Sequence, residues 1–227
     1  AENVERNRNL KPSQTAQATV NAAVETVTTA YGNTISYTQE GLHILGHGGQ
    51  EVVAELIDTN ACAHQVVQPG GLVACGFDLG GGVLAIAWKT ASYTGGNAAY
   101  YVGAMANDWG DVWSEAFAAC GAEMGAIAGT PCRIVSIVFS STGQVVRVVA
   151  VSVGDTAGYT ARNGAVTFHA LSQIPAAFFR LDPQGVLDAT FGVFHGVLCT
   201  AGDLLALIPR LFVGLFGEDI PSVCPNN

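Results

Sequence analysis

The most unusual hydrophobic pattern lies between Gly185 and Gly217, where 20 of 33 residues are apolar and three are charged. Read as a helix, its polar and small residues follow at steps of three or four and form one narrow stripe among Leu, Val, Ile and Phe. A segment that is apolar nearly all round is expected to be buried or to face something other than water. The stripe consists of Asp188, Gly192, His195, Cys199, Asp203, Ala206 and Arg210.

Two features divide this apolar segment. Pro209 lacks a backbone donor and favours a break near residue 205. Gly202 followed by Asp203 offers a second break, because an aspartate can cap the start of a helix. The pattern therefore predicts two helices, at about 185–200 and 203–216.

The segment is short of what a bilayer requires. A membrane-spanning helix needs about 20 predominantly apolar residues, whereas the longest charge-free run here, 189–202, has 14. Burial in a core or subunit interface is therefore the first interpretation, contact with lipid the second and a spanning helix the third. The residues predicted to make assembly or lipid contacts are Phe191, Phe194, Leu204, Leu205, Leu207, Leu211, Phe212 and Phe216.

Shorter apolar runs, separated by glycine-rich or polar turns, predict β-strands in the rest of the chain. Several of these runs are rich in valine, whose branched side chain favours strands over helices. Two pairs of neighbouring runs have hairpin spacing. The predicted strands are 33–38, 71–77, 82–88, 133–139, 145–153 and 165–170.

Two stretches of this part have a helical period. Ser13 or Thr15 can cap a helix that continues to Tyr31 and stops at Gly32. The clearest amphipathic pattern is 97–125, in which large apolar residues recur at steps of three or four. Its predicted buried stripe is Val102, Met105, Trp109, Val112, Trp113, Ala116, Phe117, Cys120 and Met124.

This order of elements predicts an α+β fold, with an antiparallel sheet, helices packed on one side and an apolar helical C-terminal region, stabilised by disulfides. Three parts are expected along the chain. They are a polar N-terminal arm at 1–12, an α+β domain at 13–184, and the apolar helical region at 185–227 with a disulfide-tethered tail.

The composition narrows the choice of partners. Charged residues make up 12% of the chain, against about 25% in an average soluble domain. Such low charge suits a protein that hides much of its surface against partners or works outside the cell. The net charge of −9 disfavours nucleic acid and anionic membrane surfaces.

Six cysteines without a metal-binding spacing predict disulfides and an oxidising compartment. Pairing of sequence neighbours is the favoured one of 15 connectivities, and six free thiols in a cytosolic protein are the alternative. The polar opening of the chain fits a mature exported protein whose signal peptide has been removed. A secreted, extracellular or cell-envelope location follows. The expected pairs are Cys62–Cys75, Cys120–Cys132 and Cys199–Cys224.

No motif for a nucleophile elbow, a zincin, a phosphate loop or a dinucleotide site is present. A continuous helix would align two histidines and two glutamates as metal ligands, but the glycines between them argue against such a helix. We therefore predict no metal and no cofactor. The four aligned residues are His43, His47, Glu51 and Glu55.

These observations predict a secreted, non-enzymatic structural protein that assembles with itself into an envelope layer, filament or other homopolymer. The first alternative is a secreted protein that binds lipid or another apolar ligand, or contacts a membrane. The second is a secreted hydrolase in which His169 or His195 works with Asp188 or Asp203. Any chain of this length offers such combinations, so an enzyme is not favoured.

Overall fold

The computed structural model describes residues 14–57 and 70–224, and this part of the chain is helical except for short connections and residues 215–224 after the last helix. Three helices are unusually long, at 44, 53 and 50 residues. The elements are α2 (Gln14–Ile57), α4 (Gly71–Glu123), α5 (Gly125–Ala128), α6 (Thr130–Phe179), α7 (Pro183–Leu205) and α8 (Leu207–Gly214).

The predicted α+β fold with an antiparallel sheet is wrong, because the described residues contain no strand. All six predicted strands lie within α2, α4 and α6. The buried residues of α6 explain why a helix forms despite the many valines. Gly129, just before the helix, and Ser136, Gly143 and Ala150 within it are buried at intervals of seven. Seven residues are two helical turns, whereas in a strand they would alternate between opposite faces.

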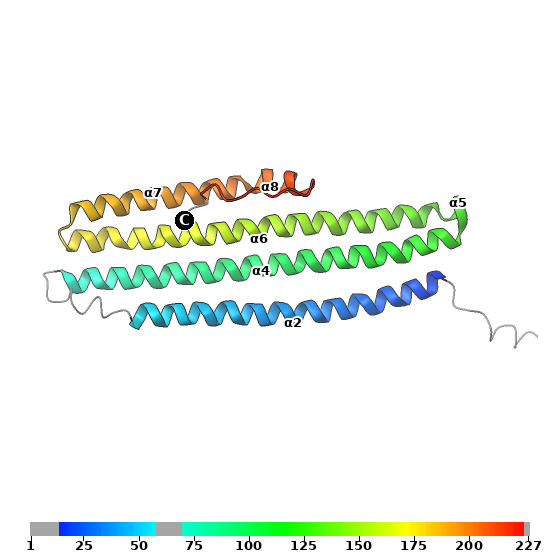
Figure 1. Cartoon of the computed structure of the whole chain (residues 1–227), viewed down its shortest axis with the longest axis horizontal. Helices are drawn as coiled ribbons and strands as arrows, with labels where there is room; N and C mark the ends of the chain where they lie inside the picture. Colours follow the sequence, from blue (N-terminus) through cyan, green and yellow to red (C-terminus); the bar gives the residue numbers. More distant parts are fainter. Residues whose placement is uncertain (1–13, 58–69, 225–227) are drawn as a thin grey trace, which may run out of the picture. The chain divides into compact units, whose positions relative to one another are not determined.

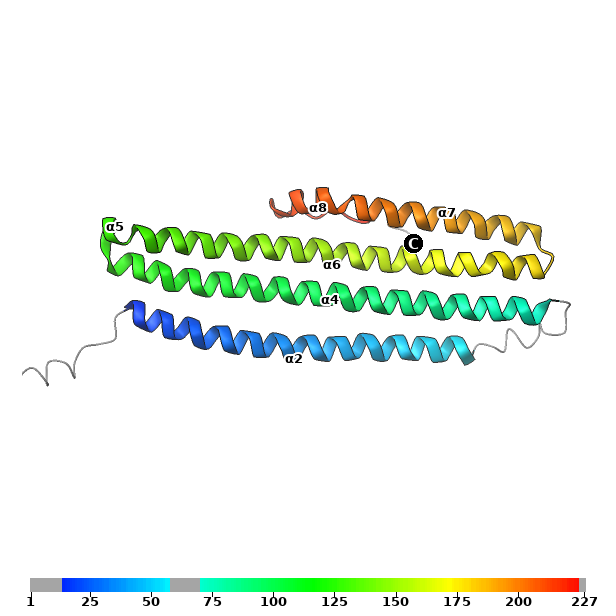
Figure 2. The ribbon, with the colours of Figure 1, turned by 180° about the vertical axis from the view of Figure 1, so that it is seen from behind.

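The described chain divides into two compact units, each built from parts of the long helices. Unit 1 contains residues 14–36 and 101–148, and unit 2 contains 37–57, 70–100 and 149–224. In each unit, α4 lies between α2 and α6 (Figures 1 and 2). In unit 2, α6 also lies between α4 and the pair α7–α8, so that each unit is a single row of helices.

In unit 1, the helices approach closely because glycines line the seam between α4 and α6. A Cβ atom at Gly143 would lie 2.8 Å from the carbonyl oxygen of Ala106 and 3.1 Å from Cα of Gly110. The Ser114 and Ser136 hydroxyls are 2.9 Å apart in the same seam. On the other side of α4, the Trp109 indole donates to the carbonyl oxygen of Thr26 at 3.3 Å.

In unit 2, small residues also separate the helices. A Cβ atom at Gly48 of α2 would collide with Thr90 of α4, and one at Gly196 of α7 would collide with Thr167 of α6. Between α4 and α6, the Trp88 indole donates to the carbonyl oxygen of Thr160 at 3.0 Å. The seams are therefore lined by small residues and crossed by hydrogen bonds, with aromatic pairs between α4 and α6 beside them.

The helical period at 97–125 is confirmed, because this segment lies in α4 up to Glu123, but its predicted buried stripe is largely wrong. Val102 and Met124 are exposed, and Ala116 is the one fully buried member. The buried positions of this segment include Gly103, Gly110 and Gly121. A stripe of small residues faces the neighbouring helix, so the large residues point elsewhere.

The other predicted helices are partly confirmed. The first helix does not stop at Gly32, since α2 continues to Ile57. The C-terminal segment does form two helices, and they divide at Ala206 rather than at Gly202. Asp182 caps α7 by accepting a hydrogen bond from the Gly185 amide.

The disulfides Cys120–Cys132 and Cys199–Cys224 are present. The first joins the end of α4 to the start of α6, and the second ties the residues that follow α8 to α7. Cys75 is not a free thiol, and its expected partner Cys62 lies outside the described residues, as does the arm at 1–12.

Candidate functional site

Burial in this protein is the reverse of that in a typical soluble domain. Among the described residues, the buried hydrophobic positions are all alanine or cysteine. Large apolar side chains are exposed instead, and Phe191, Leu205 and Phe216 are 72%, 73% and 84% exposed. The candidate functional surface therefore lies on the outside of the helices.

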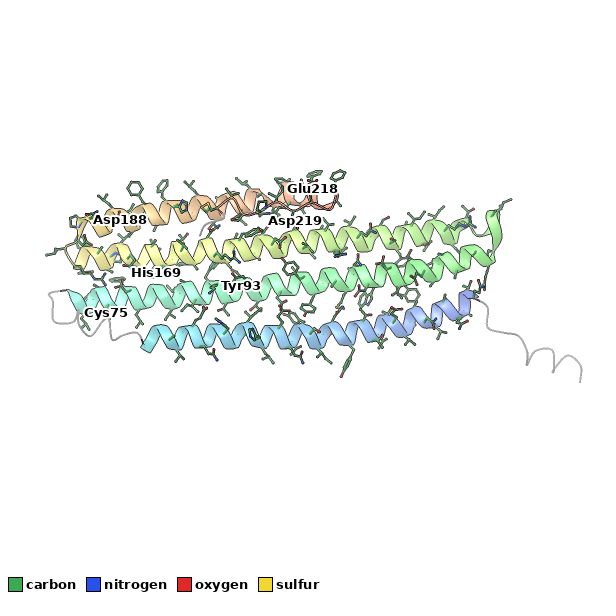
Figure 3. All side chains as sticks on the ribbon, in the orientation of Figure 1. Cys75, Tyr93, His169, Asp188, Glu218 and Asp219 are labelled. Carbon is green, nitrogen blue, oxygen red and sulfur yellow. A yellow bond between two sulfur atoms is a disulfide. The ribbon has the colours of Figure 1, made fainter. Side chains whose placement is uncertain are left out.

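The α7–α8 pair shows how the sequence produces this arrangement. Its buried side repeats every seven residues, at Ala189, Gly196, Asp203 and Arg210. The opposite side carries large apolar residues, and in Figure 3 side chains project from these helices away from α6. Of the residues predicted to make assembly or lipid contacts, Phe191, Phe194, Leu204, Leu205, Phe212 and Phe216 are exposed, and Leu207 and Leu211 are half-buried.

In unit 2, large apolar residues gather on one side of the row, which we call the apolar side of unit 2. On α4, they recur at steps of four, seven and four residues from Val73 to Trp88, so they remain on one side of the helix. Trp88 packs against Phe168 of α6, with ring centroids 5.6 Å apart, so this side continues onto α6. Its exposed members are Leu42, Leu45, Val73, Phe77, Leu84, Trp88, Val149, Val153, Leu171, Phe178, Val197, Leu204 and Ile208.

Polar contacts join the helices on the other side of the same row, which we call the polar side of unit 2. Lys89 of α4 is 3.0 Å from the Glu51 carboxylate of α2. Arg180 of α6 pairs with Asp78 of α4. On this side, two tyrosines of α4 form hydrogen bonds with charged residues of α6. These pairs are Tyr93 with Arg162 and Tyr100 with Asp155.

Unit 1 also exposes large apolar residues, on the edge of α2 opposite the buried Ala22 and beside the seam between α4 and α6. Val20, Val24, Val27 and Tyr31 form an exposed stripe along α2 at steps of four, three and four. On α4 and α6, Phe117 and Phe139 stack with centroids 5.4 Å apart. The charged residues point away from these stripes according to their helical spacing. They are Glu25, Asp108, Asp111, Glu115, Arg133 and Arg147.

A buried ion pair fixes α7 and α8 to α6 in unit 2. Asp203 and Arg210 are 0% and 3% exposed, and Arg210 Nη2 is 2.8 Å from Asp203 Oδ1. The five N–H groups of the guanidinium are all used, because they also reach Asp203 O, Thr156 Oγ1 and two carbonyls of the tail. Asn163 donates to the other carboxylate oxygen at 2.7 Å. With its hydrogen bonds satisfied, this cluster is structural.

The histidines singled out in the sequence lie on three helices of unit 2, and among the described residues His195 alone lies within a group of three possible metal-ligand atoms. His195 lies beside Cys199 and Cys224, but the two sulfur atoms are bonded to each other and cannot act as thiolate ligands. Contrary to expectation, α2 is continuous through the glycines around His47. The His47 Nδ1 atom is 3.3 Å from the Glu51 carboxylate, and Lys89 contacts the same carboxylate. His169 is exposed on α6.

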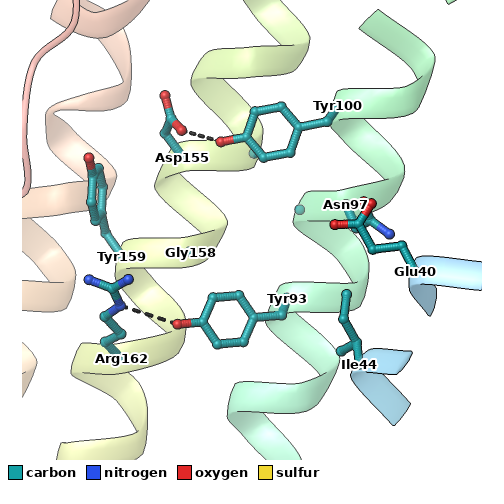
Figure 4. A pocket seen from close by; sticks show the side chains of 11 residues that line it. Glu40, Ile44, Tyr93, Asn97, Tyr100, Asp155, Gly158, Tyr159 and Arg162 are labelled. Carbon is teal, nitrogen blue, oxygen red and sulfur yellow. Dashed lines mark hydrogen bonds between the residues drawn. The ribbon is translucent and has the colours of Figure 1, made fainter. Parts of the chain in front are cut away.

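A pocket of about 480 Å³ opens among α2, α4 and α6 in unit 2 (Figure 4). Gly96, Gly154 and Gly158 leave the space, and the polar groups around it come from all three helices. The amide of Asn97 is 7% exposed, and its Nδ2 has no hydrogen-bond partner among the described residues. The other lining residues are Glu40, Ile44, Tyr93, Tyr100, Asp155, Tyr159 and Arg162.

This pocket was not predicted from the sequence. Two signals could have indicated it once the segments were assigned as helices. Gly154 and Gly158 are four residues apart and therefore share a helix face, as do Tyr93 and Tyr100 at a spacing of seven. The predicted strand at 145–153 ended just before the glycine pair.

Burial raises the pKa of Tyr100, and its hydrogen bond to the Asp155 carboxylate raises it further. The neutral phenol of Tyr100 therefore stabilises the folded protein, and this contribution is complete below the ordinary tyrosine pKa of about 10. It is lost as the pH rises through the raised pKa of the folded state. We expect an alkaline titration followed by ultraviolet absorbance to show one late-ionising tyrosine. Tyr100→Phe should remove that late step, and an unchanged titration would contradict the assignment.

By length and composition, three helical stretches could cross a membrane: Gly71–Glu123, Thr130–Phe179 and Pro183–Gly214. No protein-family model, curated protein or solved structure matches the chain. Fold and surface together define an all-helical protein with small residues in its seams and large apolar residues on its surface.

Proposed function

We propose that this is an exported, non-enzymatic protein that binds lipid surfaces through its apolar sides. The observation that carries the proposal is the segregation of side chains in unit 2. Large apolar residues are exposed on one side of its row of helices and along the edge of α7 opposite α6, and charged residues lie on the other side. Helices with this division lie in the plane of a lipid–water interface. An exposed apolar surface of this extent marks a site of protein or membrane contact.

Lying on the surface fits the charge pattern better than spanning. The longest charge-free runs of α4, α6 and α7 are Thr90–Asn107, Asn163–Phe179 and Ala189–Gly202, with 18, 17 and 14 residues. Each is shorter than the roughly 20 residues that a bilayer core requires.

Unit 1 supports the same choice. The apolar start of α6 packs against the part of α4 that carries Asp108, Asp111 and Glu115, as the stacked rings of Phe117 and Phe139 show. A spanning arrangement would place these carboxylates in hydrocarbon, at a cost of several kcal/mol. On a surface, they face water.

Two double variants on one helix test the proposal. Leu42→Asp with Leu45→Asp introduces two charges on the apolar side of α2, where the leucines are 65% and 54% exposed. Burying a leucine contributes about 1.5–3 kcal/mol, so we expect binding to phosphatidylcholine vesicles to weaken at least about 100-fold. Cosedimentation measures the binding.

The matched control is His43→Asp with Gln50→Asp, which adds the same two charges at exposed positions elsewhere on α2. Vesicle binding of the control should equal that of the unaltered protein. Equal binding by both double variants, or no binding by the unaltered protein, would overturn the proposal. Neutral vesicles are used because the net charge of −9 would oppose anionic ones.

Self-assembly, the function first predicted from the sequence, is the second candidate, since another copy of the chain could cover the same apolar sides. The regular exposed stripe from Val20 to Tyr31 favours it, because such spacing suits helix–helix packing. Light scattering separates the two candidates. Large particles in the absence of lipid that dissociate in the Leu42→Asp, Leu45→Asp variant would favour self-assembly.

A further inference from the structure

The pocket on the polar side of unit 2 has features of a binding site that the proposed lipid contact does not use. It is lined by three tyrosines, two carboxylates, one guanidinium and one amide. Its volume of about 480 Å³ falls within the range of small-molecule sites. The buried Asn97 Nδ2 group lacks a partner among the described residues, and an unsatisfied buried donor is costly unless a ligand or water accepts from it.

Opposite charges occupy the two ends of the pocket. At one end, Tyr100 donates a hydrogen bond to the Asp155 carboxylate. At the other, Arg162 Nε donates to the Tyr93 hydroxyl at 3.2 Å. Asp155 and Arg162 are seven residues apart on α6, which is about 10.5 Å along the helix. Figure 4 shows these two tyrosine contacts as parallel rungs between α4 and α6, with Gly158 between them.

We propose that this pocket binds a small, soluble zwitterion that carries an organic ammonium group and an anionic oxygen group. The ammonium lies toward Asp155 and Glu40 and against the tyrosine rings, which attract cations through their π-faces. The anionic oxygens accept from the guanidinium N–H groups of Arg162. The lining residues belong to the polar side of unit 2, so a ligand from the aqueous phase fits better than a lipid held on the apolar side.

Gly158 permits a variant that fills the pocket without disturbing the helices. A Cβ atom there would meet only the ring of Tyr93, at 3.9 Å, which is an ordinary contact. Leucine is also a better helix former than glycine, so Gly158→Leu should fold at least as well as the unaltered protein. The matched control is Gly80→Leu, at an exposed α4 position outside the pocket lining where a Cβ atom meets nothing within 4 Å.

The experiment titrates the full chain with phosphocholine by calorimetry, with choline and inorganic phosphate as the two half-ligands and without vesicles. We expect saturable phosphocholine binding that is tighter than binding of either half-ligand. Gly158→Leu should weaken it at least tenfold, and Gly80→Leu should leave it unchanged. Asp155→Asn should weaken choline more than phosphate, and Arg162→Gln should do the opposite.

Several outcomes would overturn the inference: no saturable binding of phosphocholine, equal binding of choline alone, or unaltered binding by Gly158→Leu. Because no vesicle is present, this result is independent of the proposed lipid contact. A second arm measures binding of Gly158→Leu to phosphatidylcholine vesicles. Unchanged vesicle binding supports a free solute as the ligand, whereas a loss would assign the pocket to the lipid headgroup and overturn a soluble ligand.

Discussion

Replacing Arg210 with methionine should lower the free energy of unfolding by about 3–5 kcal/mol. The substitution leaves the Asp203 carboxylate, which is 0% exposed, without its charged partner. It also removes hydrogen bonds to the carbonyl oxygens of Ile220 and Pro221, which hold the tail. Guanidinium denaturation followed by circular dichroism measures the loss.

A second substitution separates the ion pair from general packing. Replacing both charges, in Asp203→Leu with Arg210→Met, should restore part of the lost stability, because no charge is then buried without a partner. Asp188→Asn provides the control, since this carboxylate is exposed on α7, the helix that also carries Asp203. It should change stability by less than about 0.5 kcal/mol. A change that small for Arg210→Met would contradict a stabilising role for the pair.

The second large effect is expected at the glycine seam of unit 1. Gly143→Leu should reduce stability by about 3 kcal/mol, the upper end of the usual cost of overpacking. Its Cβ atom would lie 2.8 Å from the carbonyl oxygen of Ala106, and two backbones must separate to admit it. The same denaturation measurement applies.

Gly32→Leu is the matched control for this prediction. Gly32 lies in α2 of the same unit, and a Cβ atom there meets nothing within 4 Å. Helix propensity alone predicts that both substitutions stabilise, by up to about 1 kcal/mol. We expect that outcome at Gly32 and the opposite sign at Gly143. Stabilisation of both variants would show that the seam tolerates wider spacing.

The sequence was informative where a pattern has one physical interpretation. The break between α7 and α8 follows from the missing backbone donor of Pro209, and the pairs Cys120–Cys132 and Cys199–Cys224 follow from their proximity in sequence. The narrow stripe through Cys199, Asp203 and Arg210 was also visible, although its role as the buried side was not. Large residues were assumed to point inward, and in this protein they point outward.

The fold class could not be obtained in the same way. A valine-rich run such as 145–153 suits a buried strand and an exposed helix side equally well when only composition is considered. The deciding signal was the spacing of small residues, with Ser136, Gly143 and Ala150 seven apart. Small residues contribute little to hydrophobic periodicity, so a search for large apolar stripes passes over them. The pocket was missed for the same reason, because glycines create it.

The arrangement of each unit as a single row also bears on how the protein can change over time. A helix in the middle of a row contacts neighbours only along its two seams, and its two flat sides contact no other described helix. Substitutions on a flat side can therefore alter what the protein adheres to without altering how its helices meet. A saturation screen should separate these two kinds of position. Seam glycines such as Gly110 would tolerate almost no replacement, while exposed flat-side residues such as Leu84 would accept many without loss of folding.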